Sequence, residues 1–206
     1  MQTPGKENLK FRNFGKQDMD QITEDWLSLV DLLNSWGFKA YLGFGSLLGA
    51  VREGDYIQDD DDVDIFYISN QTDRWFVVEE LRDLLNRLKQ SALLHKVWID
   101  GGLSWGELWT DEMYPVGQQH VWSPNKRNVF DLFTSWVEKD DLIFCQWGRC
   151  GKVNLKEKRI PFRDIEIAVP VGSEKILEYL FGDWKTPRGE KIKLERSTWL
   201  YRNPFE

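Results

Sequence analysis

Apolar residues recur three and four positions apart in three stretches of the chain, 17–36, 74–90 and 173–181. Residues at this spacing share one face of a helix, so each stretch predicts an amphipathic helix. A shorter helix is expected over 47–51. Gly37 follows the first stretch, where a glycine typically ends a helix.

The ends of the longer helices carry capping residues. Asp18 or Asp20 is expected to cap the first helix, because a carboxylate there accepts a hydrogen bond from an unpaired backbone N–H of the first turn. Ser173 is expected to cap the last helix, with Glu174 in its first turn and Gly182 after its end.

Short apolar runs between the helices predict strands. The run 63–68 is apolar except at Asp64, which is typical of a strand buried on both faces. The segment 113–125 is expected to be an aromatic-rich connection. This order of helices and strands predicts a mixed α/β or α+β core. The strand candidates are 38–44, 63–68, 93–99, 103–109, 128–133, 142–146 and 159–167.

Composition narrows the function classes. The chain has 206 residues, 41% hydrophobic and 30% charged, which fits one domain with its own core. The net charge of −7 argues against duplex nucleic acid as the main partner, because neutralising phosphates requires clustered Lys and Arg. No apolar run reaches the roughly 18 residues of a membrane span. A cytoplasmic location is the default expectation, or the Golgi or secretory lumen if the sequence is part of a longer chain.

The chain has only two cysteines and two histidines that could bind a metal through sulfur or nitrogen. Cys145 and Cys150 are either two free thiols or a hairpin disulfide. The two histidines, His95 and His120, stand in unrelated settings. These residues therefore argue against a His-rich or Cys-rich zinc site.

The acidic run 59–64 leads directly into an apolar strand. In an extended chain alternate side chains share a face, so Asp60, Asp62 and Asp64 project together. Neighbouring carboxylates raise each other's pKa and destabilise the fold unless a cation lies between them. Oxygen ligands favour Mg²⁺, Mn²⁺ or Ca²⁺.

The acidic run 59–64 has two other interpretations, a calcium-binding loop and a solvated turn. A calcium-binding EF-hand loop starting at Asp60 fails, because Ile65 stands where the turn needs glycine and Gln71 where a bidentate glutamate is expected. A solvated acidic turn remains the alternative.

Residues outside the acidic run are candidates for the same site. Gly45 and Ser46 end a predicted strand and open a helix, a junction that offers backbone N–H groups and a hydroxyl to a phosphate. Arg52 could hold phosphate oxygens bidentately. Asp131 is one acid inside an apolar strand; it is either a third metal ligand or a hydrogen-bonded structural residue.

These motifs resemble the LicD/fukutin family, a branch of the nucleotidyltransferase superfamily. Its pattern is approximately Gly-(Thr/Ser)-Leu-Leu-Gly-x-x-Arg, a short loop, and Ile-Pro-Trp-Asp-Asp-Asp-x-Asp. Asp131 fits the family's later acidic strand, and 177–184 its closing segment. The sequence departs from the pattern at Gln58-Asp59, where the family has Pro-Trp. The matching residues are Gly45, Ser46, Leu47, Leu48, Gly49, Arg52, Ile57, Asp60, Asp61, Asp62 and Asp64.

The resemblance implies a fold and a reaction. The expected fold is α+β, a nucleotidyltransferase-like mixed sheet flanked by helices, with extra C-terminal strands and a helix. A polar lead-in (1–16) and an irregular tail (188–206) would flank a single domain over 17–187. The implied reaction is Mg²⁺- or Mn²⁺-dependent transfer of phosphocholine or an alditol phosphate from a CDP-linked donor to a glycan hydroxyl.

The resemblance also implies residue roles. The catalytic and metal-binding residues would be Asp62, Asp64 and Asp131. The acceptor proton would be taken by Asp131, with Asp60 as the second candidate. The residues that bind the donor would be Gly45, Ser46, Arg52 and Asp60, with Ser46 and Arg52 holding its phosphate oxygens. Two alternatives stay open: nucleotidyl transfer to a small-molecule hydroxyl, and a non-catalytic glycan-binding module that uses some of the 11 Trp as sugar platforms.

Overall fold

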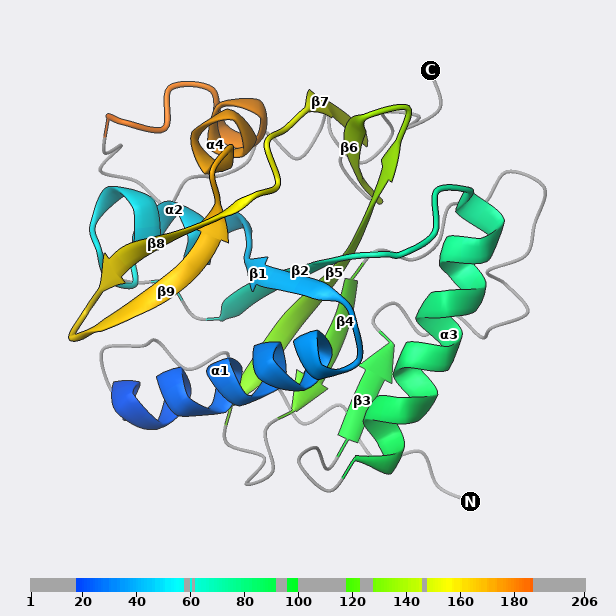
Figure 1. Ribbon diagram of the computed structural model, residues 1–206. Helices are drawn as coiled ribbons and strands as arrows, with labels where there is room; N and C mark the ends of the chain where they lie inside the picture. The colour runs from blue at the N-terminus through cyan, green and yellow to red at the C-terminus, as the bar shows by residue number, and fades with distance from the viewer. Residues whose placement is uncertain are drawn as a thin grey trace.

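The computed structural model describes residues 18–57, 60, 62–91, 96–99, 118–122, 128–145 and 148–186. These ranges hold four helices and nine strands (Figure 1). The helices are α1 (Met19–Ser35), α2 (Phe44–Arg52), α3 (Arg74–Gln90) and α4 (Ser173–Phe181). The strands are β1 (Lys39–Leu42), β2 (Val63–Ile68), β3 (Lys96–Ile99), β4 (Gln118–Trp122), β5 (Val129–Glu138), β6 (Asp141–Phe144), β7 (Gly148–Lys152), β8 (Glu157–Phe162) and β9 (Ile165–Pro170).

Seven of the strands form one mixed sheet. Five of them lie in the order β1-β2-β5-β4-β3, and β6 and β7 are joined to it through β5. The central pair, β2 and β5, is parallel, and the other pairs are antiparallel. The long strand β5 pairs with β4 through its first half and with β6 through its second half, and β7 extends the sheet from β6. A separate hairpin, β8–β9, makes a second, two-stranded sheet.

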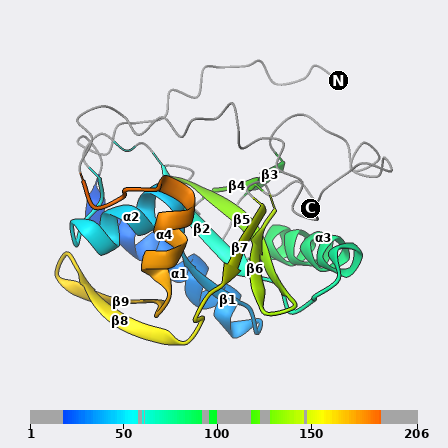
Figure 2. The same cartoon turned by 90° about the horizontal axis from the view of Figure 1, so that it is seen from above.

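Helices lie against the sheet and against each other. In Figure 1, α1 lies below β1 and β2 and α3 lies beside β3, and these pairs are in contact. The view from above shows α2 and α4 side by side near the β8–β9 hairpin (Figure 2). One large apolar cluster joins these elements, and within it the ring of Phe66 packs against those of Tyr41 and Phe144. The fold is thus α+β with a mixed sheet, as the sequence predicts.

The helices predicted from periodicity are confirmed closely. The Asp18 carboxylate caps α1 by accepting a hydrogen bond from the Gln21 N–H, and Gly37 follows its end with a φ of +88°. Helix α3 has the predicted bounds, and α4 ends at Gly182, whose φ is +66°. Among the described residues, no helix is both long and apolar enough to cross a membrane.

One predicted cap is wrong. Gly172, and not Ser173, precedes the first turn of α4, and the Ser173 hydroxyl donates to the carbonyl of Pro170. A side chain at position 172 has no room, because a Cβ there would lie 2.6 Å from the Cγ1 of Val153 and 2.9 Å from the N of Asn154. Packing therefore selects glycine over a capping side chain at this point.

Several strands differ from the predictions. The expected connection over 113–125 contains β4, the expected strand over 159–167 is a hairpin of β8 and β9, and β7 was not predicted. Short strands with glycine or charged residues carry little periodicity, and their partners in the sheet define them. The strand expected over 103–109, the lead-in 1–16 and the tail 188–206 lie outside the described residues.

Cys145 and Cys150 are buried free thiols and do not form the hairpin disulfide that was the other alternative. They belong to different apolar clusters. Cys150 is part of the large core, whereas Cys145 packs in a small cluster with Val77, Trp136 and Ile143. A disulfide between them would require the hairpin to rearrange.

We expect both thiols to be unreactive in the folded protein. Burial raises the pKa of Cys150 to about 11 and raises that of Cys145 as well. At pH 8 about one Cys150 in a thousand is then a thiolate, the reactive form. With a chromogenic disulfide reagent, the native protein should release less than one equivalent over minutes, and the protein unfolded in guanidinium should release two. Fast reaction of the native protein would contradict the burial.

Candidate metal centre

Two of the candidate acids lie opposite each other on neighbouring strands. The parallel pairing of β2 with β5 aligns Asp64 with Asp131. Partners in register point to the same face of a sheet, so their carboxylates meet although 67 positions of sequence separate them. Asp64 is 9% exposed and Asp131 4% exposed. Two buried carboxylates thus lie side by side on the sheet.

Two further acids come from the loop between α2 and β2. The carboxylates of Asp62, Asp64 and Asp131 each offer an oxygen, and these oxygens lie within 4.8 Å of one another. Asp60 approaches from the side of α2: the position that a Cβ on Gly45 would take lies 3.0 Å from Asp60 Oδ2 and 3.3 Å from Asp64 Oδ2. The structure therefore brings together the four acids that the sequence analysis singled out.

The first turn of α2 holds Asp64 in place. The N–H of Gly45 donates to Asp64 Oδ2 at 2.9 Å, and the N–H of Asp64 donates to Ser46 Oγ at 2.9 Å. The N–H of Gly43 also donates to the carbonyl oxygen of Asp64, at 2.8 Å. A helix N-terminus favours nearby negative charge, so this end of α2 stabilises the carboxylate that it touches.

Phe44, between these glycines, was not predicted to take part in the site. Its φ of +41° is unusual for a residue with a side chain. Its ring is packed against Phe133 and Phe144, with centroids 4.2 and 5.6 Å away. This packing holds the backbone in the conformation that starts α2 at Phe44 instead of Leu47, and aims the Gly45 N–H at Asp64. A bulky residue between two glycines is the one signal that the sequence offers.

The electrostatics of the cluster favour a cation. Burial raises the pKa of Asp64 well above its usual value, and the negative charges of Asp62, Asp131 and Asp60 raise it further; the Gly45 N–H lowers it only in part. A cation among these oxygens would offset both the burial and the repulsion. The donors are carboxylate oxygens held a few ångströms apart, the set that Mg²⁺ and Mn²⁺ prefer, so the residues present fit such an ion.

The residues predicted to hold phosphate lie at two ends of α2. Gly45 and Ser46 are next to Asp64, and Ser46 is buried, at 2% exposed. Arg52 is in the last turn, where its guanidinium donates to Glu53 Oε1 and to the carbonyl of Trp184. Arg52 thus ties the end of α2 to the segment after α4. Direct contact of Ser46 and Arg52 with phosphate stays a prediction.

A comparison with protein-family models matches residues 37–170 to the domain described as LicD/FKTN/FKRP, nucleotidyltransferase domain. The match covers about two thirds of the chain and contains all four acids of the cluster. This chain belongs to that family. No curated protein matched the chain in a second comparison. Members of the LicD family are generally transferases, and membership indicates a phosphotransferase-like role in glycan modification.

Proposed function

We propose that this LicD-family protein transfers a phosphate-linked group, phosphocholine or an alditol phosphate, from a CDP-activated donor to a hydroxyl of a glycan, with a divalent cation. The observation that carries the proposal is the convergence of the Asp62, Asp64 and Asp131 oxygens within 4.8 Å, beside the first turn of a helix. An oxygen-only cation site beside the N-terminus of a helix is suited to a diphosphate.

The proposed cation ligands are Asp62, Asp64 and Asp131, for Mg²⁺ or Mn²⁺. The chemistry supplied by a bound cation is neutralisation of the charge that grows on the diphosphate as its anhydride bond breaks. Gly45 leaves space beside Asp60 and Asp64, since it lacks the Cβ that would lie 3.0–3.3 Å from their oxygens. In this proposal Gly45, Ser46, Arg52 and Asp60 form the donor side of the site.

The proposed reaction is one displacement at phosphorus. The oxygen of the acceptor hydroxyl forms a bond to the donor phosphorus distal to cytidine. The bond from that phosphorus to the bridging oxygen breaks, and CMP leaves with that oxygen. The acceptor proton passes to a carboxylate, for which Asp131 is the first candidate and Asp60 the second. The products are CMP and the phosphodiester.

The test is a panel of CDP-choline, CDP-ribitol and CDP-glycerol, each incubated with a mixture of glycan acceptors and Mg²⁺. We expect one donor to yield CMP at a rate that increases with acceptor, and EDTA to abolish the yield. Mass spectrometry of the acceptor should find the added phosphodiester.

Other outcomes would favour the alternatives. Release of pyrophosphate from a nucleoside triphosphate, with the nucleotide joined to the acceptor, indicates nucleotidyl transfer. Glycan binding that is indifferent both to EDTA and to Asp62→Ala indicates a non-catalytic binding module. Either result would overturn the proposed reaction.

A further inference from the structure

The loop between α2 and β2, called the acidic loop below, supplies two of the four clustered acids, Asp60 and Asp62. Unlike Asp64 and Asp131, these residues are not fixed by strand pairing. Like charges repel them from the strand carboxylates, so some contact must hold the loop against that repulsion. Among the described residues of the loop, Tyr56 has the most buried side chain, at 8% exposed.

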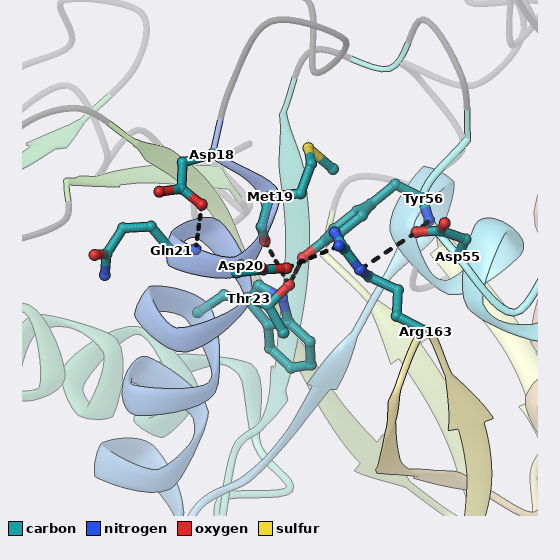
Figure 3. A network of polar contacts seen from close by, with 9 residues as sticks. Asp18, Met19, Asp20, Gln21, Thr23, Asp55, Tyr56 and Arg163 are labelled. Atoms are coloured by element: carbon teal, nitrogen blue, oxygen red, sulfur yellow. Dashed lines mark hydrogen bonds and ion pairs between the residues drawn. The ribbon is translucent and has the colours of Figure 1, made fainter.

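The hydroxyl of Tyr56 is bound to helix α1 (Figure 3). It lies 2.8 Å from Trp26 Nε1 and 2.8 Å from Thr23 Oγ1. The Thr23 hydroxyl donates its proton to the carbonyl of Met19, so Tyr56 donates to Thr23 and accepts from the indole N–H of Trp26. The result is one directed chain of hydrogen bonds, Trp26 to Tyr56 to Thr23 to Met19, with each hydroxyl used as donor and acceptor.

The ring of Tyr56 is held from the other side by the turn between β8 and β9. Phe162 packs edge-on against it, with centroids 4.9 Å apart, and the Arg163 guanidinium lies 5.9 Å from its centroid. Arg163 also binds the loop through its backbone, whose N–H donates to the carbonyl of Gly54 at 2.7 Å. Its side chain pairs with Asp20 of α1 at 2.8 Å (Figure 3).

Tyr56, which anchors the loop to α1, lies four positions before Asp60. The N–H of Asp60 donates to the carbonyl of Ile57 at 3.1 Å, and Ile57 is the residue that follows Tyr56. Asp60 is therefore tied to the neighbour of Tyr56. Movement of Tyr56 away from α1 would therefore carry Asp60 with it. Because the carboxylates repel one another, that movement leads away from Asp64 and Asp131.

We propose that Tyr56 is a positioning residue, which holds the acidic loop between α1 and the β8–β9 turn so that Asp60 and Asp62 stay beside Asp64 and Asp131. The inference rests on the proposed function in one respect, that the cluster binds a divalent cation. Tyr56 itself touches neither cation nor substrate in this role. It holds in place the loop that carries Asp60 and the proposed cation ligand Asp62.

The test is Tyr56→Phe, with Tyr41→Phe as the matched control. Tyr41 is also buried and its hydroxyl is also hydrogen bonded, but it lies on β1, and its partner is Glu157 of β8, at 3.2 Å. Titration calorimetry with Mn²⁺, and the rise of the Tm with added Mn²⁺, measure the affinity without any assay of turnover. We expect Tyr56→Phe to weaken Mn²⁺ binding about tenfold, the loss typical when a group supporting metal ligands is removed. Tyr41→Phe should bind as the wild type does, although both variants lower the Tm of the cation-free protein.

The possible results of these titrations test the positioning role of Tyr56 and the proposed function separately. Wild-type affinity in Tyr56→Phe would show that the hydroxyl only stabilises the fold, and would overturn the positioning role alone. If Tyr56→Phe does not fold, Thr23→Val removes the acceptor of the same hydrogen bond, and it should weaken Mn²⁺ binding in the same direction. Absence of Mn²⁺ binding in the wild-type protein would overturn the proposed function, and the positioning role with it.

Discussion

Replacing Asp64 with asparagine should reduce turnover by about three orders of magnitude or more, because it removes the carboxylate at the centre of the cluster. Asparagine keeps the shape of the side chain and can still accept the hydrogen bond that the Gly45 N–H donates to Asp64 Oδ2. The fold should therefore persist. The measurement is the rate of CMP release from the active donor, compared with the wild-type rate at saturating Mg²⁺.

The same variant makes a second, independent test through stability. In the cation-free wild type, Asp64 is buried beside three other carboxylates, and this raises its pKa. Removal of one negative charge relieves that repulsion, so the cation-free variant should have a Tm equal to or above that of the wild type. Added Mg²⁺ should raise the Tm of the wild type and leave that of the variant unchanged.

The matched control is Asp140→Asn. This residue is an aspartate of the same charge in the β5–β6 turn, where its exposed carboxylate pairs with Lys152. Its loss should change neither turnover nor the response to Mg²⁺, since exposed ion pairs contribute little. Wild-type turnover in Asp64→Asn would remove Asp64 from the proposed metal centre.

The second large effect is expected at Gly49. A Cβ at this position in α2 would lie 2.6 Å from the carbonyl oxygen of Asp55 and 3.0 Å from the backbone N of Ile57. Alanine in a helix normally stabilises by about 1 kcal/mol relative to glycine. Here the neighbours are backbone atoms of the acidic loop, which cannot rotate away. Gly49→Ala should therefore lower the free energy of unfolding by about 3 kcal/mol, as severe overpacking does.

Equilibrium unfolding in urea measures this change, and Gly45→Ala in the same helix is the comparison. A Cβ at Gly45 meets the carboxylate oxygens of Asp60 and Asp64, at 3.0 and 3.3 Å, which are the ends of side chains. Gly45→Ala should change the free energy of unfolding by less than about 1 kcal/mol. It should nevertheless weaken cation binding, because the methyl group displaces those carboxylates. Equal stability of Gly49→Ala and the wild type would show that the loop does not pack on α2 as described.

The local elements of this fold are largely readable from the sequence. The helices α1, α3 and α4 were predicted to within two residues at each end, because their apolar periodicity and their glycine or aspartate boundaries act over a few positions. The strands were less readable. The sequence predicts a connection where β4 lies and a single strand where the β8–β9 hairpin lies, since a short strand is defined by its partners in the sheet.

The candidate site likewise has features that the sequence predicts and features that only the structure shows. The spacing of Asp60, Asp62 and Asp64 was visible in the sequence, and the structure brings their carboxylates together with that of Asp131. The role of Phe44 and the anchor at Tyr56 were not visible. The hydrogen-bond partners of Tyr56 are 30 and 33 positions away, and no local pattern signals them.

What the sequence determined by itself is therefore the chemistry: acids at alternate positions leading into an apolar strand, a glycine-serine turn upstream, and the family to which both belong. What only the tertiary structure decided is their convergence, through the parallel register of β2 with β5 and the packing of the acidic loop on α1. The reason is physical. Residue type and short spacing are local properties, whereas register and loop position result from contacts between segments far apart in the chain.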